Sequence, residues 1–369
     1  MDASIKKDLQ KKACKVRMGV IEGTYNAKSG HPGGSLSISD TLTYLYYNKM
    51  NVDPKNPENP DRDRLVLSKG HTAPALYAVL AQKGYFPEDE LKKLRHIGAM
   101  LQGHPCISIN GVDMSSGSLG QGISVACGMA LAGKLDNKSY KVYAILGDGE
   151  IEEGQVWEAG MFASHYKLDN LVAIVDNNGL QIDGPITEVC SPEPITDKFK
   201  AFGWHVITMD GHDFDDIDRA FAEAETVTGQ PVAIIQKSVK GKGVSFMENQ
   251  VGWHGTAPNK EQYEQAMSEL WRRSPPTGPW LKTMWPWISS AENRSLPLSA
   301  LARCRTGSRC SLLAYNKPSD ATLRMAGTCS SPERTSARMS GTGSTQCTRT
   351  AYARLQQRNL WRRRLATDG

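Results

Sequence analysis

The sequence predicts an α/β fold, a parallel sheet with helices on both faces. Continuous apolar runs, such as KVYAILG (141–147) and NLVAIVDNN (170–178), alternate with segments of helical periodicity, as expected for strands that are buried on both sides. Polar groups rich in Gly, Asp, Asn and Lys follow these runs. Because ligands bind beyond the carboxyl ends of parallel strands, we expect a functional site at that edge.

The first part of the pattern opens with a long helix. Apolar residues recur at helical spacing from Ile5 to Val20 and predict an amphipathic helix over residues 4–26. The turn-rich stretch NAKSGHPGG ends this helix. The next expected elements are a helix, a proline-rich loop, a short buried strand and a helix, at about 36–48, 51–63, 64–71 and 73–83.

The second part holds the clearest alternation. A glycine-rich loop within residues 111–133 runs into a helix of small residues. Strands are then predicted at 141–147, 170–178, 204–210 and 231–239, and helices at 156–166 and 214–225. Together these segments supply the strands of one sheet and the helices that cover it.

The composition divides the chain near residue 270. Residues 1–270 contain 22 Lys and 5 Arg against 35 acidic residues, a net charge of −8. Residues 271–369 contain 2 Lys and 15 Arg against 4 acidic residues, a net charge of +13. We therefore expect an α/β domain over 1–270 and an irregular basic tail over 271–369, with disorder or poor packing in the tail.

Two interpretations of this Arg-, Ser- and Trp-rich tail are open. A basic tail can bind nucleic acid or another anionic partner. A frameshifted reading frame is the interpretation that we favour, because the change from Lys to Arg is abrupt and the helix NKEQYEQAMSEL (259–270) is cut within its pattern. We accordingly do not expect a nucleic-acid partner.

The N-terminus and the cysteines argue against several protein classes. The charged N-terminal segment lacks an apolar signal core, and no run approaches the roughly 20 apolar residues of a membrane helix. The eight cysteines include no C-x-x-C pair and indicate neither a zinc site nor a disulfide framework. We expect a cytoplasmic protein with reduced thiols and no membrane association.

The first chemistry-bearing motif is GDG at residues 147–149, which ends a predicted strand. Glycine lets a ligand approach the backbone closely, and the N–H of Gly149 is available for a phosphate. Asp148 offers a hard oxygen to a divalent cation such as Mg²⁺. Taken alone, the motif fits equally well a strand-to-helix turn with a capping Asp.

A second motif, DNN, strengthens the metal interpretation. Asn177 and Asn178 end the next predicted strand, and 27 residues separate them from Gly149, enough for one helix and one strand. Asn178 can supply a second oxygen and the carbonyl of Leu180 a third, with a diphosphate completing the shell. An Asx-turn would explain DNN alone, but the joint pattern favours a metal-bound diphosphate.

GDG followed by about 27 residues and NN resembles the thiamine diphosphate signature. The surrounding motifs are similar, in family order, to the N-terminal half of transketolase: SGHPGGSLS, SKGH, GHP, DMSSGSLGQGIS, GDGEIEEGQVWEA, DNNGLQIDG and GWHGTAPN. The similarity runs from about residue 5 to residue 270. It implies a thiamine diphosphate cofactor and transfer of a two-carbon ketol unit between sugar phosphates.

The resemblance also implies roles for individual positions. Asp148, Asn178 and the carbonyl of Leu180 would hold Mg²⁺ or Ca²⁺. The cofactor contacts would come from His71, Gly117, Ser118, Leu119, Gly149, Asn178 and His254. The segment SSGSLGQGIS (115–124) also fits a glycine-rich turn followed by tight helix packing.

Four histidines lie in glycine-flanked loops: His31, His71, His104 and His254. Any one of them alone could be an exposed polar residue. By resemblance, they line the channel above the cofactor, where they bind sugar hydroxyls and move protons. Imidazole suits that task because its pKa lies near the working pH.

Further charged residues near the motifs are expected to differ in location and role. Glu153 resembles a family carboxylate at the dimer interface, whereas Glu150 and Glu152 are expected to be solvated. KSVKGKGVSFMEN (237–249) is similar to a loop that covers the cofactor. Its three lysines, Lys237, Lys240 and Lys242, could equally form a solvated edge.

The resemblance covers only one half of the family's site. No stretch after residue 270 resembles the second domain, which holds the aminopyrimidine and supplies a glutamate. GSLGQG (117–122) resembles bacterial subunits in which the two halves are separate chains. We therefore expect a C-terminal transketolase subunit as partner, in a dimer or heterotetramer. The alternatives are a related enzyme, such as 1-deoxyxylulose-5-phosphate synthase or dihydroxyacetone synthase, and a truncated non-catalytic cofactor-binding protein.

Overall fold

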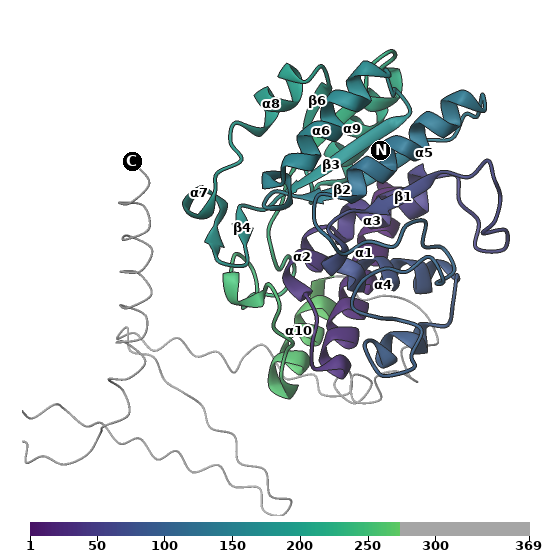
Figure 1. Cartoon of the computed structure of the whole chain (residues 1–369). Coiled ribbons are helices and arrows are strands. Elements are labelled where there is room, and N and C mark those ends of the chain that lie inside the picture. Colours follow the sequence, from purple (N-terminus) through teal and green to yellow (C-terminus); the bar gives the residue numbers. More distant parts are fainter. Residues whose placement is uncertain (274–369) are drawn as a thin grey trace, which may run out of the picture. The chain divides into compact units, whose positions relative to one another are not determined.

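The computed structural model describes residues 1–273, and the expectations for residues 274–369 lie outside the described part of the chain. Within residues 1–273, five parallel strands form one sheet in the order β1-β2-β3-β7-β6 (Figure 1). The strands are β1 (Arg64–Leu67), β2 (Val142–Gly147), β3 (Leu171–Asn177), β6 (His205–Asp210) and β7 (Val232–Lys237). This arrangement confirms the predicted parallel sheet.

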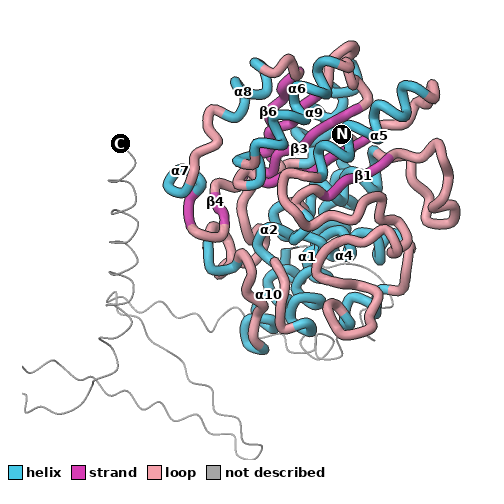
Figure 2. Tube along the Cα trace, viewed as in Figure 1, coloured by secondary structure: helices cyan, strands magenta, loops and turns pink. Residues whose placement is uncertain are grey.

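Side chains of successive strand residues enter two separate cores. On β2, Tyr143 and Ile145 belong to one core, whereas Val142, Ala144 and Leu146 belong to the other, as the two-residue period of a strand requires. The first core also contains residues of α1 (Ala3–Ala27), α3 (Ser39–Tyr44), α4 (Ala73–Lys83), α9 (Phe214–Thr226) and α10 (Lys260–Arg273). The second contains residues of α5 (Gly122–Leu135), α6 (Gly154–His165) and α8 (Ile195–Ala201). Helices therefore cover both faces (Figure 2).

The single helix expected at about 36–48 is divided in the structure. It consists of α2 (Pro32–Ser37), α3 and one π-helical turn over Leu45–Lys49. Hydroxyl groups donate to carbonyl oxygens four residues earlier, from Ser35 to His31 at 2.7 Å and from Ser39 to Ser35 at 2.9 Å. Such bonds compete with the backbone ladder and bend helices, which explains why apolar spacing alone did not predict the break.

The carboxyl ends of three neighbouring strands meet at one edge of the sheet. Gly147 of β2 pairs with Asp176 of β3, and Asn177 of β3 pairs with Lys237 of β7. The short ribbon of β4 (Leu180–Gln181) and β5 (Gly184–Pro185) follows β3 at this edge. Residues that are far apart in the sequence are thus brought to a common location, as predicted for GDG and DNN.

The described part of the chain ends with α10. This helix runs to Arg273, so it passes the expected boundary at residue 270. Leu270 is buried, and Trp271 packs against the first core. Within residues 1–273, no helix is long and apolar enough to cross a bilayer.

Candidate functional site

A cavity of about 270 Å³ lies at the carboxyl edge of the sheet. Nine of the eleven residues that the resemblance assigned to metal, cofactor or sugar line it: His31, His71, Gly117, Leu119, Asp148, Gly149, Asn178, Leu180 and His254. Two others, Ser118 and His104, are not among the lining residues. The ring of His104 packs against the backbone of Gly117, where a Cβ atom would lie only 3.3 Å from it. His104 and Ser118 are both exposed.

Asp148 lines this cavity and is held by backbone groups. Its Oδ1 accepts a hydrogen bond from the N–H of Gly149 at 2.9 Å, and its Oδ2 accepts one from Gly179 at 2.5 Å. The side chain is almost fully buried, with 2% exposure. Burial, with the nearby charge of Asp176, raises the pKa of Asp148 to about 6. A bound cation would stabilise the carboxylate form.

The two other proposed metal ligands lie beside Asp148. Oδ1 of Asn178 accepts from the N–H of Leu180 at 3.1 Å, and the carbonyl oxygen of Leu180 accepts from Nζ of Lys240 at 3.0 Å. Among residues 1–273, no group of three or more His, Cys, Asp or Glu side chains could hold a metal. One carboxylate and two neutral oxygens fit a hard cation that takes its remaining ligands from phosphate and water.

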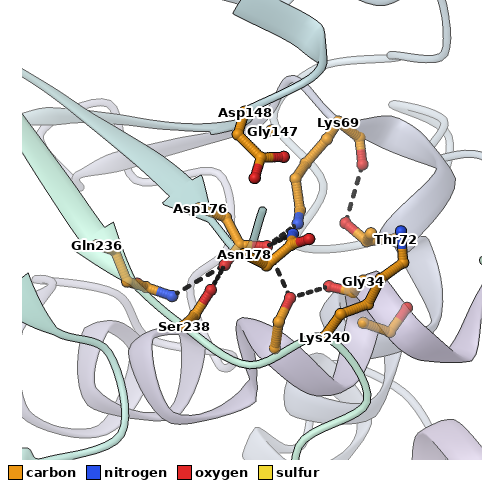
Figure 3. A network of polar contacts seen from close by, with 12 residues as sticks. Gly34, Lys69, Thr72, Gly147, Asp148, Asp176, Asn178, Gln236, Ser238 and Lys240 are labelled. Carbon is orange, nitrogen blue, oxygen red and sulfur yellow. Dashed lines mark hydrogen bonds and ion pairs between the residues drawn. The ribbon is translucent and has the colours of Figure 1, made fainter. Parts of the chain in front are cut away.

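A buried polar network supports the cavity, and the sequence did not reveal it (Figure 3). Its centre is Asp176, which is fully buried. The carboxylate accepts hydrogen bonds from five side chains: Ser37, Lys69, Asn178, Gln236 and Ser238. Burial acts to raise the pKa of Asp176, but the charge of Lys69 and these donors outweigh burial and lower it. Asp176 and Lys69 belong to the motifs DNN and SKGH, in which the sequence predicted roles for Asn178 and His71.

Lys240 does not belong to a solvated edge, which was one of the two interpretations of the lysines in residues 237–249. Lys237 is exposed and Lys242 half-buried, but Lys240 is only 2% exposed and lines the cavity. Its Nζ lies 2.8 Å from Nδ1 of His254. Burial, followed by repulsion from Lys69, lowers the pKa of Lys240 to about 8. The turn after β7 directs this lysine inward, which a run of alternating Lys and Gly does not predict.

Glu150 was expected to be solvated, and this expectation is wrong. Its Oε1 accepts from the hydroxyl of Ser68 at 2.5 Å and from the N–H of Gly120 at 2.9 Å, and its Oε2 accepts from the N–H of Gly147 at 2.9 Å. Helix α6 begins only at Gly154, and Glu150 lies in a 3₁₀ turn that folds back onto β2. Burial raises its pKa. This buried side chain ties the glycine-rich loop to the strand end.

The other two carboxylates of this stretch are less buried. Glu152 is half-buried and accepts a hydrogen bond from Gln181 at 2.9 Å. Glu153 is exposed, so its side chain is accessible for the interface contact that the resemblance implies. That role stays a prediction.

Three of the four histidines form a compact cluster on the cavity wall. The ring centroids of His31, His71 and His254 are 5.2 to 5.6 Å apart. Burial is the main cause that lowers the pKa of His31 to about 4, of His254 to about 3, and of His71 well below its usual value. These imidazoles are therefore neutral at pH 7. Within residues 1–273, the buried Nδ1 of His31 has no hydrogen-bond partner.

The charges around the cavity suit an anion bound together with a cation. Lys69 and Lys240 bring two buried ammonium groups, Asp148 and Glu150 bring carboxylates, and the amide of Asn178 and the carbonyl of Leu180 bring neutral oxygens. Gly117, Gly147 and Gly149 leave room between the backbone and the cavity. The neutral imidazoles can accept or donate protons at the same opening. The residues present thus fit a metal-bound diphosphate on one side and a hydroxylated substrate on the other.

Comparison with known proteins supports this interpretation. A family model described as "Transketolase, thiamine diphosphate binding domain" matches residues 9–275. The 6-deoxy-6-sulfo-D-fructose transketolase subunit of Clostridium sp. is 48% identical over 264 residues, covering 71% of this chain and 96% of that subunit. An apulose-4-phosphate transketolase subunit of Phocaeicola vulgatus is 45% identical over 259 residues, covering 70% and 92% respectively.

Longer transketolases are also similar, but over less than half of their length. The human enzyme is 44% identical over 264 residues, which are 71% of this chain and 42% of the human chain. The crystal structure of transketolase from Campylobacter jejuni has a TM-score of 0.69 and 34% identity, covering 73% of this chain and 43% of that one. This chain therefore spans less than half of these longer proteins and nearly all of the two bacterial subunits.

Proposed function

The chain belongs to the transketolase family of transferases and contains its thiamine diphosphate-binding domain, and on this basis we propose that it is the cofactor-anchoring subunit of a two-chain transketolase. The observation that carries the proposal is the cavity that joins Asp148, Asn178 and Leu180 to three neutral histidines. The proposed reaction transfers a two-carbon ketol unit from a ketose phosphate to an aldose phosphate.

We assign the diphosphate side of the cavity to the cofactor and its metal. Asp148, Oδ1 of Asn178 and the carbonyl of Leu180 would hold Mg²⁺ or Ca²⁺. His71, Gly117, Ser118, Leu119, Gly149, Asn178 and His254 would contact thiamine diphosphate. Lys69 and Lys240 add positive charge beside it. When bound, the cofactor supplies the carbanion chemistry of ketol transfer, and the protein supplies geometry and electrostatics.

The histidines would handle protons on the sugar. A neutral imidazole can accept a proton from a substrate hydroxyl and return it later. His31, His71 and His254 are kept neutral by burial, so His31 and His71 each keep one ring nitrogen that can accept a proton at pH 7. Nδ1 of His254 already accepts from Lys240, so His254 would present its Nε2–H to the sugar as a donor. His104 lies against Gly117 of the glycine-rich loop. It would contact the sugar from outside the cluster of His31, His71 and His254.

Exposed apolar side chains support the need for a partner. Leu119 and Ile182 line the cavity and are 39% and 63% exposed. Single exposed apolar residues are common, but two that open onto one cavity mark an interaction surface. We propose that a chain carrying the pyrimidine-side glutamate covers it, with Glu153 at the interface, in a dimer or heterotetramer. The cytoplasmic location of this chain and its role in the pentose phosphate pathway stay predictions.

Calorimetry and a coupled assay test the proposal in two stages. The full chain should bind thiamine diphosphate with Mg²⁺ and lose affinity when EDTA is added. It should transfer no ketol unit alone, and should do so once a pyrimidine-side half is supplied as a separate chain. Because the two similar bacterial subunits are named for different sugars, the donor panel should include pentose, sulfonated and branched sugars. Turnover by the chain alone would contradict the two-chain assignment.

A further inference from the structure

In the loop after β7, Ser238 contacts the buried network around Asp176 and Lys240 lines the cavity. A histidine outside the cavity accepts a hydrogen bond from the backbone of this loop. We propose that His212 is a positioning residue, which holds residues 238–240 so that Ser238 and Lys240 reach their partners. The inference rests on the function proposed above. His212 lies in the turn between β6 and α9 and is not among the residues that line the cavity.

A line of contacts joins four segments that are distant in the sequence. The guanidinium of Arg17, on α1, donates to both carboxylate oxygens of Asp40, on α3. Oδ2 of Asp40 lies 2.8 Å from Nδ1 of His212. Nε2 of His212 lies 2.9 Å from the backbone nitrogen of Val239. The side chains of Arg17, Asp40 and His212 are 9%, 7% and 10% exposed, so water competes little for these bonds.

The backbone partner fixes the tautomer of His212. The N–H of Val239 can only donate, so Nε2 must accept and the ring proton is carried by Nδ1. Nδ1 then donates to Asp40. Burial acts to raise the pKa of Asp40, but the charge of Arg17 and the hydrogen bond from His212 together outweigh it and lower this pKa to about 2. Asp40 is therefore a carboxylate at neutral pH and keeps the imidazole in the orientation that Val239 requires.

The anchored loop serves the cavity directly. On one side of Val239, the hydroxyl of Ser238 donates to Asp176, at the centre of the buried network. On the other side, Nζ of Lys240 donates to the carbonyl of Leu180 at 3.0 Å and contacts His254. The hydrogen bond from the Val239 N–H to His212 thus holds the backbone between Ser238 and Lys240. Lys240 is the residue of this loop that contacts both the proposed metal side, at Leu180, and the proposed sugar side, at His254.

Two substitutions at His212 separate its two contacts. His212→Asn places an amide near the position of Nδ1, so it can still donate to Asp40 but has no acceptor for Val239. His212→Gln reaches the Nε2 position with a carbonyl oxygen, so it can still accept from Val239. His205→Asn is a matched control, because His205 is a partly exposed residue at the other end of β6 that pairs with Glu223.

Hydrogen exchange and cofactor titration on the full chain measure the effect. In His212→Asn, the amide of Val239 should exchange about tenfold faster without cofactor, and thiamine diphosphate with Mg²⁺ should bind about tenfold more weakly, as expected for one lost buried hydrogen bond. His212→Gln should lie near wild type in both, and His205→Asn should not differ from it.

Several outcomes would overturn the inference. Unchanged Val239 protection in His212→Asn would do so, as would equal loss in the Asn and Gln variants. If His212→Asn does not fold, His212→Gln decides: near-wild-type affinity supports positioning through Val239, and a tenfold loss contradicts it. Failure of the wild-type chain to bind cofactor would count against the proposed function instead, and Val239 exchange would still decide the role of His212.

Discussion

Nζ of Lys240 lies 2.8 Å from Nδ1 of His254 and also donates to the carbonyl oxygen of Leu180 at 3.0 Å. One buried cation therefore contacts an imidazole that we assign to the sugar and a carbonyl that we assign to the metal. Since the ammonium group donates, Nδ1 of His254 accepts, and its ring proton is on Nε2. The sugar side and the metal side are coupled through a single side chain.

Replacing Lys240 should make His254 more basic. Burial is the first cause of the lowered His254 pKa, and the charge of Lys240 is the second. Lys240→Met should therefore raise that pKa above about 3 while leaving it below the ordinary value of 6.5. An NMR titration of the imidazole Hε1 signals would measure the change. Lys237→Met, at an exposed lysine, is the control, and an unmoved His254 titration in Lys240→Met would contradict the coupling.

Replacing Asp148 should remove metal-dependent cofactor binding without unfolding the protein. Asp148→Asn keeps the size of the side chain but removes the only carboxylate of the proposed metal set. We expect the affinity for thiamine diphosphate with Mg²⁺ to fall by more than about 100-fold, beyond the loss usual for outer-shell residues. Calorimetry would measure this loss. Asp183→Asn, at an exposed aspartate nearby, should bind normally, and wild-type affinity in Asp148→Asn would exclude the metal role.

Replacing Glu150 should cost stability. Glu150→Ala leaves three buried donors, on Ser68, Gly120 and Gly147, without their partner. Unsatisfied buried groups of this kind lower the free energy of unfolding by about 3 kcal/mol in sum. Urea denaturation would measure the loss. Glu152→Ala, at a half-buried neighbour, should stay within about 0.5 kcal/mol of wild type; similar losses in both variants would argue against the special place of Glu150.

Removing residues 274–369 should leave the described domain folded. The described residues of both cores lie within residues 1–273, and α10 contributes Leu270 and Trp271 to the first core. A chain that ends at Arg273 should keep its thermal midpoint and its cofactor affinity. One that ends at 269 should be less stable, because these two contacts are lost. Differential scanning calorimetry would compare them, and global unfolding of the 1–273 chain would refute the expectation.

The sequence predicted those parts of the site whose positions follow from where the strands end. The apolar runs of β2 and β3 specify two adjacent buried strands, and parallel pairing then sets Gly147 opposite Asp176. Asp148 and Asn178 necessarily follow at the same edge. The histidines could be assigned to the site only through the family resemblance. Their loops have no helical or strand periodicity from which the positions of the side chains could be predicted.

The buried charges could not be predicted in this way. The sequence gives no reason to bury Glu150, Lys69 or Lys240, because burying a charge is costly unless donors or counter-charges surround it. Those partners come from distant segments. Ser37 of α2 and Gln236 of β7, for example, both reach Asp176. Only the assembled fold shows that enough partners are present to keep these groups inside.

The five donors around Asp176 have a consequence for how this protein can diverge. They come from four stretches of the chain, since Gln236 and Ser238 lie together at the end of β7, and each satisfies part of one buried carboxylate. The effects of changes within such a network are not additive, since removal of one member alters the value of the others. Substitutions at Ser37, Lys69 and Gln236 should therefore be accepted in evolution as compensated sets, and homologues should show these positions varying together.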